Sequence, residues 1–287
     1  MKIIVTGSLG NISKPLSQQL VKAGHSVTVI SSSAEKKEEI TALGAQPAIG
    51  KLEDVDFLTQ TFTGADAAYC MIPFDFQEQD QAKYFKKITE SYVQAIKGAG
   101  IKQVVLLSGW AADIGESFNT GEMLNQLSDI AVAELRPGAF YTNFYGYIGM
   151  IKQNDVIMAN YGGEDKIAFV SPEDIATAAF EELTTPFQGK KVRYVASDEL
   201  TCNEAARILG EAIGKPALKW IIITEAQMLN GLIHAGFPLQ LANDLVSMQA
   251  ATHSGAVYNN YLRHRPVLGK TKLKDFAKDF AAAYHQQ

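Results

Sequence analysis

The sequence predicts an α/β fold, in which helices cover both faces of a doubly wound parallel sheet and a smaller, mostly helical part is added to it. Two observations predict this fold. Strand and helix patterns alternate along the N-terminal two thirds of the 287 residues, which is typical of a parallel sheet with crossover helices. Several of the predicted helices also end at a glycine, the residue that most often follows a helix C-terminus. A chain of this length buries a core large enough to fold without disulfides or metals.

Seven apolar segments, several of them rich in β-branched residues, are the expected strands of the sheet. They are residues 2–6, 26–30, 46–49, 67–71, 103–107, 131–135 and 191–195. The helices expected between the first five strands are residues 14–23, 34–43, 54–62 and 77–97. A further helix over 174–183 follows Ser171 and Pro172, a pair that is typical of a helix start.

After about residue 136 the pattern changes. Helical patterns then recur over 203–213, 224–234, 238–251 and 271–284, and residues 252–270 have the weakest pattern. We therefore expect a core formed by residues 1–135, with 186–197 returning to its sheet. We expect a smaller substrate- or partner-binding part formed by residues 136–185 and 198–287, packed over the carboxyl edge of the sheet, where open α/β sheets bind ligands.

Composition limits the classes of partner. Lys and Arg number 26 against 31 Asp and Glu, and the formal net charge is −5, so the chain lacks the basic surface of a nucleic-acid-binding protein. No apolar run approaches the length of a signal peptide or a membrane span. The two cysteines, Cys70 and Cys202, are far apart and lack histidines at metal-ligand spacing, so neither a disulfide nor a metal site is expected. A cytoplasmic location fits these features best.

The first turn carries the strongest functional signal. A buried strand over Ile3–Val5 runs into Gly7 and Gly10, and a helical pattern follows at once. A helix that starts at the end of a strand presents unpaired N–H groups to an anion. The spacing is G-x-x-G-x-x-S, with Ser13 where the dinucleotide fingerprint has a third glycine. An ordinary tight turn would use the same glycines, but the position between strand and helix favours dinucleotide binding.

Five segments together resemble the NmrA-like branch of the atypical short-chain dehydrogenases/reductases. They are Thr6–Ile12, Ala23–Val27, Phe62–Ala67, Ala99–Ser108 and Leu135–Phe140, the last followed by Asn143 and Phe144. The resemblance implies a Rossmann-type sheet that binds NADP or NAD on its N-terminal turn. It also implies a function among quinone or carbonyl reductases, or among proteins that bind the dinucleotide without obvious catalysis, because fold alone does not decide function.

The resemblance and the strand ends together predict the cofactor site. Its expected residues are Thr6, Gly7, Leu9, Gly10, Asn11, Ile12, Ser31, Ser32, Ser33, Lys36, Met71, Ile72, Pro73 and Ser108. The second strand ends in serines and has no acidic residue there to hold the ribose of NAD, so NADP is favoured and NAD remains possible. Alternatively, Ser33 only caps the helix that begins at Ala34.

The superfamily's usual active site pairs a tyrosine with a lysine four residues later, and none of the eleven tyrosines has such a partner. Without that proton relay, reduction of a carbonyl loses its general acid, whereas reduction of a quinone demands less of the protein. Ser108 is the expected catalytic residue, orienting the acceptor oxygen, unless its hydroxyl merely closes a turn. An aromatic wall for a planar substrate is expected from Phe74, Trp110, Phe140, Tyr141 and Phe144, with core packing as the alternative.

Three functions therefore follow from the sequence. The first is an NADP-dependent oxidoreductase that reduces a quinone or a similar small electrophile by hydride transfer. The second is a non-catalytic NADP(H)-responsive sensor that binds a regulatory protein partner. The third and weakest is an isomerase or epimerase of a nucleotide sugar, which normally uses the tyrosine that is absent here. No metal, nucleic acid or membrane partner is expected.

Overall fold

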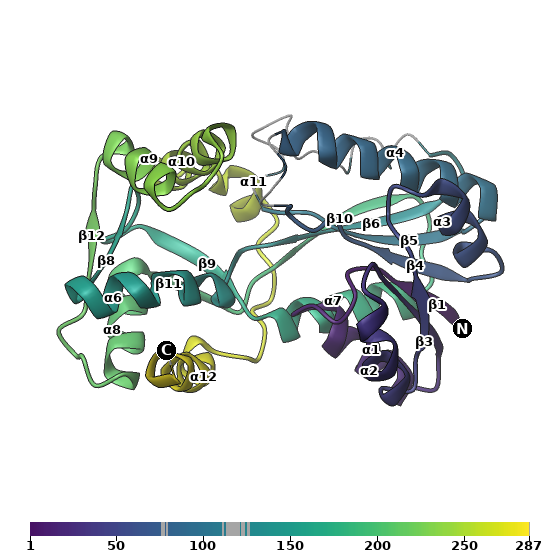
Figure 1. Ribbon diagram of the computed structural model, residues 1–287, viewed down its shortest axis with the longest axis horizontal. Helices are drawn as coiled ribbons and strands as arrows, with labels where there is room; N and C mark the ends of the chain where they lie inside the picture. The colour runs from purple at the N-terminus through teal and green to yellow at the C-terminus, as the bar shows by residue number, and fades with distance from the viewer. Residues whose placement is uncertain are drawn as a thin grey trace. The chain divides into compact units, whose positions relative to one another are not determined.

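The computed structural model describes residues 1–75, 78, 80–110, 112, 121, 124 and 127–286. The chain divides into two compact units (Figure 1). Unit 1 comprises Met1–Asp75, Gln81–Arg136 and Ile175–Arg193, and unit 2 is built mainly from Pro137–Asp174 and Tyr194–Gln287.

Unit 1 contains a seven-stranded sheet in the order β10-β6-β5-β4-β1-β2-β3. Every pairing from β3 across to β6 is parallel. The strands are β1 (Lys2–Val5), β2 (Ser26–Ser31), β3 (Gln46–Ile49), β4 (Ala67–Cys70), β5 (Gln103–Leu107), β6 (Ala131–Pro137) and β10 (Lys190–Val195). This is the doubly wound, Rossmann-type sheet that the sequence predicts, and the strand order reverses between β1 and β4.

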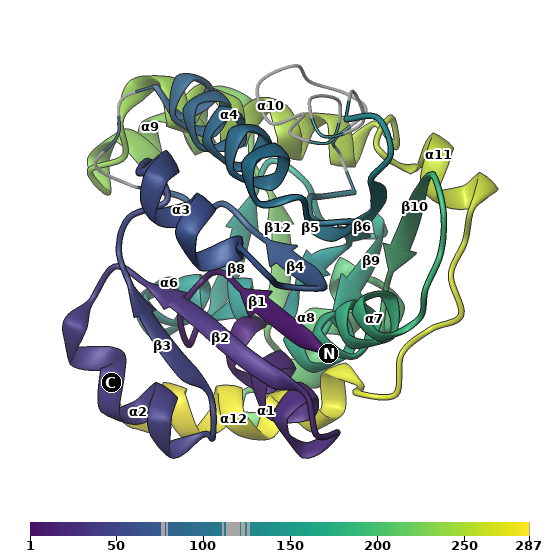
Figure 2. The same ribbon diagram turned by 90° about the vertical axis from the view of Figure 1, so that its right-hand side faces the viewer.

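Helices cover both faces of this sheet (Figure 2). On one face lie α3 (Val55–Phe62) and α4 (Gln81–Ala99), and on the other α1 (Ser13–Lys22), α2 (Lys37–Ala42) and α7 (Pro172–Thr184). The short 3₁₀ helix η1 (Ala34–Lys36) precedes α2. Asp54 caps α3 by accepting a hydrogen bond from the N–H of Phe57, which is why this helix begins there.

The core under α3 and α4 is built from one row of strand residues. Ile4, Ala68, Val104 and Val132 lie opposite one another on β1, β4, β5 and β6, and all four are at most 3% exposed. Because side chains alternate along a strand, these residues share one face. Tyr92 of α4 and other residues of both helices pack on them. Burial of such side chains contributes about 1.5–3 kcal/mol each.

Unit 2 has two small sheets. One has the order β11-β9-β7, from β11 (Asp198–Thr201), β9 (Lys166–Val170) and β7 (Ala139–Phe140). The other pairs β12 (Lys219–Ile222) with β8 (Val156–Ala159) in parallel. Its helices are η3 (Tyr141–Tyr147), α6 (Ile148–Asn154), α8 (Cys202–Ala212), α9 (Glu225–His234), α10 (Leu239–His253), α11 (Tyr258–Arg263) and α12 (Leu273–Gln286). The sequence predicts α8, α9, α10 and α12, but it does not predict these short strands or α11.

An aromatic cluster forms the core of unit 2. The ring of Phe144 packs on Phe169 at 5.2 Å and on Trp220 at 6.3 Å between centroids. The ring of Tyr141 packs on Phe276 of α12 at 5.5 Å. Contacts of this size and geometry stabilise beyond the area that they bury. The C-terminal helix is therefore part of this core.

Candidate active site

The carboxyl ends of β1 and β4 lie side by side at the point where the strand order reverses. In open α/β sheets this crevice is the usual ligand site. The segment that leaves β1 is the glycine turn before α1, and the segment that leaves β4 begins with Met71. Both segments were predicted to hold the cofactor, and the fold brings them together.

The glycine turn is shaped by Gly7 and Ser13. Gly7 has φ +89°, and a Cβ at this position would lie 2.7 Å from Oγ of Ser13. The Ser13 hydroxyl donates a 2.7 Å hydrogen bond to the carbonyl of Thr6. Ser13 therefore links the helix to the end of the strand, and this serine replaces the third glycine of the common fingerprint with a direct hydrogen bond.

Several backbone N–H groups of this turn lack an acceptor. Within the described residues, the N–H groups of Leu9, Asn11, Ile12 and Ser13 donate to no protein acceptor. The N-cap residue of α1 is Ile12, whose side chain cannot cap the helix. Unpaired N–H groups at a helix N-terminus are suited to a phosphate. These donors, together with the close approach that Gly7 allows, fit the pyrophosphate of a dinucleotide.

The end of β2 is tied to the same turn. Ser8 donates from its N–H to the carbonyl of Ile30 at 3.0 Å, and its hydroxyl bonds that of Ser31 at 2.9 Å. Ser31 Oγ also accepts from the N–H of Ser33 at 3.2 Å, whereas the Ser33 side chain makes no capping bond to η1. Ser32 is exposed, and its hydroxyl is in position to meet solvent or a ligand.

The predicted residue Lys36 lies just beyond these serines. Its Nζ is 3.0 Å from a carboxylate oxygen of Glu39, and Nζ of Lys14 is 2.9 Å from the other oxygen. The two lysine hydrogen bonds, that from Lys14 first, lower the pKa of Glu39 below its usual value. The sequence prediction included Lys36 but missed Lys14 and Glu39, because the two helices that carry them meet only in the folded chain.

The end of β4 is held by Thr6 and Tyr92. The Thr6 hydroxyl accepts from the N–H of Met71 at 2.9 Å, and the Tyr92 hydroxyl donates to the carbonyl of Met71 at 2.7 Å. Burial raises the pKa of Tyr92 well above its usual value, so this hydroxyl stays protonated. Beyond Met71, Ile72 is buried and Phe74 is 48% exposed, with Pro73 also exposed.

Ser108 follows β5, the strand next to β4. Its N–H donates to the carbonyl of Leu135 at 2.9 Å, which fixes the backbone at the end of the strand. Its Oγ is buried, and within the described part of the chain it has no hydrogen-bond partner. Buried polar atoms are nearly always paired, so a hydroxyl without a partner among the described residues is a candidate for contact with a bound molecule. Trp110, two residues further on, is 9% exposed.

The other predicted aromatic residues lie in unit 2. Tyr141 is fully buried and Phe144 is 2% exposed, and the Tyr141 hydroxyl donates to Asp198 at 2.7 Å. Phe140 is half-buried. The burial of Tyr141 and Phe144 favours the alternative considered for them, in which aromatic rings pack the core.

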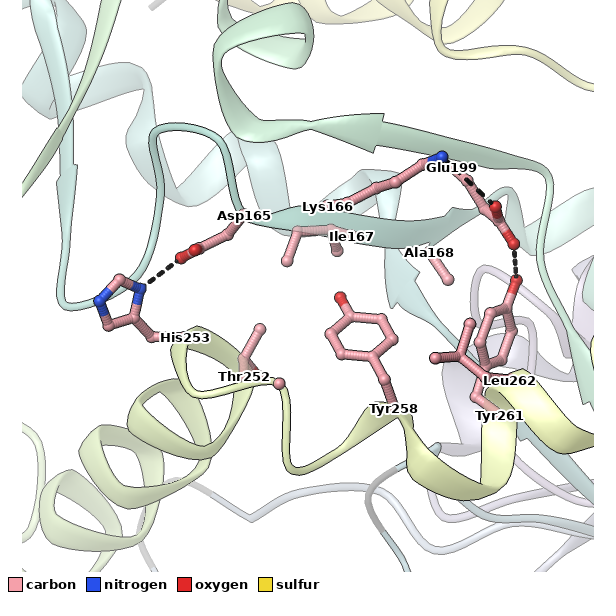
Figure 3. Close-up of a pocket in the computed structure, with 11 residues that line it drawn as sticks. Asp165, Lys166, Ile167, Ala168, Glu199, Thr252, His253, Tyr258, Tyr261 and Leu262 are labelled. Carbon is pink, nitrogen blue, oxygen red and sulfur yellow. Dashed lines mark hydrogen bonds and ion pairs between the residues drawn. The ribbon is translucent and has the colours of Figure 1, made fainter.

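Unit 2 also contains a cavity of about 350 Å³ that sequence reasoning did not predict (Figure 3). At one end Nδ1 of His253 lies 2.7 Å from Asp165. At the other, Glu199 accepts a hydrogen bond of 2.7 Å from Tyr261 and also binds Arg265. Tyr258 lies between the two ends. Both carboxylates are thus already paired with protein donors.

Among the described residues, no group of three or more His, Cys, Asp and Glu side chains is arranged to hold a metal ion. In the same part of the chain, no helix combines the length and the apolarity that crossing a membrane requires.

Comparison with known proteins agrees with the geometry of the turn. Residues 7–139 match the model of a family described as NAD(P)H-binding. This segment is an NAD(P)H-binding domain. It includes the glycine turn and the ends of β2, β4 and β5, and it confirms the predicted cofactor class and the resemblance to NmrA-like proteins.

Sequence similarity to curated proteins extends beyond the NAD(P)H-binding domain. Festuclavine synthase II of Penicillium roqueforti is 29% identical over 180 residues, which cover 59% of this chain and 61% of that protein. The matched segments span from 34% to 69% of the length of the curated relatives.

Solved structures with the same fold cover nearly the whole chain. A NADPH-dependent quinone oxidoreductase from Escherichia coli, complexed with NADPH, has a TM-score of 0.81 at 21% identity and covers 96% of this chain and 99% of its own. The triphenylmethane reductase of Citrobacter sp., complexed with NADP(H), has a TM-score of 0.79 at 20% identity, with coverage of 97% and 99%. At these identities the likeness shows the fold.

Proposed function

We propose that the protein is an NADP-dependent oxidoreductase that reduces a quinone or a similar small electrophile by hydride transfer. The observation that carries the proposal is the buried hydroxyl of Ser108 at the carboxyl edge of an NAD(P)H-binding sheet, which has no hydrogen-bond partner among the described residues. When bound, a reduced nicotinamide supplies the hydride. The residues of the chain bind the cofactor, orient the acceptor and polarise its oxygen.

The binding role falls to the glycine turn. The free N–H groups of Leu9, Asn11, Ile12 and Ser13 hold the pyrophosphate, and Gly7 lets it approach the backbone. Thr6 and Tyr92 hold the backbone of Met71 in place at the end of β4. Preference for NADP is supported by the lysines beside β2 and by the serines, rather than an acid, at its end.

The orienting role falls to Ser108. Its hydroxyl donates to the oxygen of the acceptor, which gains negative charge as hydride arrives, and such a donor stabilises the developing charge. Trp110 and Phe74 follow the same strand ends and are proposed to contact the ring of the acceptor. The substrate-binding role of Phe140, which is half-buried in unit 2, stays a prediction.

A quinone is favoured over a simple ketone because the tyrosines lack the lysine partner of the usual proton relay. None is followed by a lysine at the fourth position. Burial raises the pKa values of Tyr69 and Tyr92 in unit 1, so these groups are poor proton donors near neutral pH. Reduction of a quinone produces an aromatic hydroquinone whose oxygens take protons from water.

The test is loss of reduced-nicotinamide absorbance with a panel of quinones. We expect NADPH to be oxidised faster than NADH, and Ser108→Ala to lower kcat/KM by about tenfold or more. Ser91→Ala is the matched control, because the Ser91 hydroxyl donates to the carbonyl of Lys87 within its own helix, α4. No turnover with any acceptor would overturn the proposal.

The second candidate is a dinucleotide-responsive sensor, and the missing Tyr-Lys pair favours it. In this function NADP(H) binds the same turn and changes the affinity for a regulatory protein partner. Pull-down experiments with and without NADPH test it. Tight NADPH binding, no acceptor reduction and cofactor-dependent partners support the sensor, whereas identical partners under both conditions argue against it.

The cytoplasmic location stays a prediction.

A further inference from the structure

A carboxylate bridges two lysines beside the end of β2. One carboxylate oxygen of Glu39 accepts a hydrogen bond from Nζ of Lys14 at 2.9 Å, and the other accepts one from Nζ of Lys36 at 3.0 Å. The side chains are 41%, 43% and 47% exposed respectively, so all three are reached by solvent. The cluster has two positive charges and one negative charge.

The three residues come from different elements. Lys14 is in the first turn of α1, Lys36 ends η1, and Glu39 is in α2. The hydrogen bonds of Ser8 to Ile30 and Ser31 fasten the glycine turn to β2. The cluster is therefore held at the strand end where an NAD(P)H-binding domain distinguishes a ribose hydroxyl from a 2′-phosphate.

The carboxylate and a phosphate monoester are alternative partners for the same lysines. A phosphate monoester carries about −1.5 to −2 at pH 7, against −1 for the carboxylate. The lysine hydrogen bonds lower the pKa of Glu39, so the carboxylate remains charged at neutral pH. An exposed ion pair is weak, so a dianionic phosphate can displace the carboxylate of Glu39 from the two lysines.

We propose that Glu39 limits the preference for NADP(H) over NAD(H) by competing with the 2′-phosphate for Lys14 and Lys36. The cofactor displaces the carboxylate into solvent and takes both ammonium groups. Glu39 then lies beside the bound phosphate as a like charge. The inference rests on the dinucleotide site of the proposed function, but it does not depend on reductase activity.

The test compares two nucleotides that differ only in the 2′-phosphate, namely adenosine 2′,5′-bisphosphate and 5′-AMP, by calorimetric titration of the whole chain. We expect Glu39→Gln to tighten binding of the bisphosphate about two- to fivefold and to leave 5′-AMP unchanged. The double variant Lys14→Ala/Lys36→Ala should weaken the bisphosphate by about tenfold or more, until the two nucleotides bind alike.

The neighbouring residues supply matched controls. Glu38 and Lys37 lie in the same helix and are exposed, and neither takes part in an ion pair within the described residues. Glu38→Gln and Lys37→Ala should leave both affinities unchanged. Circular dichroism, with an unchanged thermal midpoint, shows that each variant is folded.

The outcomes separate this proposal from the proposed function. If the nucleotides behave as expected but no acceptor is reduced, the reductase is wrong and the role of Glu39 stands. If Glu39→Gln leaves the bisphosphate unchanged, or changes both nucleotides equally, the competition does not exist. If Glu39→Gln weakens the bisphosphate, Glu39 positions the lysines instead, and this proposal is overturned.

Discussion

The hydroxyl of Tyr92 donates a 2.7 Å hydrogen bond to the backbone carbonyl of Met71. This bond joins α4 to the end of β4, at the edge of the sheet where we propose that the cofactor binds. Tyr69 in the same unit is equally buried, but its hydroxyl has no partner in the described part of the chain. The two tyrosines therefore differ in what their hydroxyls contribute.

Tyr92→Phe should lower the free energy of unfolding by about 1–2 kcal/mol, because the part-buried carbonyl of Met71 loses its shorter hydrogen bond and keeps only that from the Thr6 hydroxyl at 3.5 Å. It should also weaken NADPH binding, since Met71 is no longer fixed. Tyr69→Phe removes an unpaired hydroxyl and should be neutral or stabilising. Denaturant unfolding and NADPH fluorescence measure both effects. Equal destabilisation by the two substitutions would contradict the conclusion that only the Tyr92 hydroxyl stabilises the fold.

Gly7→Ala should disrupt the phosphate-binding turn. The residue has φ +89°, and the new Cβ would contact Ser13 and Met71 at under 3 Å. Gly24→Ala is the control, because Gly24 has φ +81° and open space around it. The control should lose about 1–2 kcal/mol of stability from backbone strain alone, and Gly7→Ala should lose more and bind NADPH at least about tenfold more weakly. A binding loss in both variants would assign the effect to strain.

Glu199→Ala should destabilise unit 2. Its carboxylate is 9% exposed and accepts from Tyr261 and Arg265, and hydrogen bonds to charged groups are worth about 1.5–3 kcal/mol. Glu211→Ala breaks the exposed pair with Arg207 and should cost less than about 0.5 kcal/mol. Urea unfolding of both variants checks this ranking. A similar loss of unfolding free energy in the two variants would refute it.

Alkaline pH should unfold the protein through its tyrosines. Burial raises the pKa of Tyr261 to about 12, and it raises the pKa of Tyr69 and Tyr92 as well. The unfolded value is about 10, so the stability from these groups is fully present below pH 10 and is lost as pH rises toward 12. Unfolding free energies between pH 9 and 12 should fall, and less steeply in Tyr261→Phe. Tyrosinate absorbance with a midpoint near 10 in the native protein would count against this.

Much of unit 1 could be predicted because its signals are local. The strand expected over 103–107 is β5 without change, and that expected over 46–49 is β3. The helix expected from residue 77 is α4, which begins at Gln81; residues 77 and 79 lie outside the described part. Parallel strands buried on both faces form continuous apolar runs, which a sequence displays directly.

Unit 2 was harder to predict because its contacts are distant in sequence. Val156 of β8 lies opposite Lys219 of β12, and strands of four residues carry too little periodicity to be recognised. The aromatic run at Phe140–Tyr147 was expected to face a ligand in part, but Tyr141 and Phe144 pack on Phe276 of the C-terminal helix. In the site, Lys14 and Glu39 were missed for the same reason, since an ion pair between two helices leaves no local pattern.

The interleaving of the two units limits how the protein can be divided. Unit 1 takes Ile175–Arg193 from beyond the first long segment of unit 2, and these residues supply most of α7 and β10, the strand beside β6. A gene fragment that stops at Arg136 would leave β6 as an uncovered edge, which invites aggregation. A usable nucleotide-binding fragment therefore has to join residue 136 to residue 175 with a new linker, and no single cut in the gene separates the two parts.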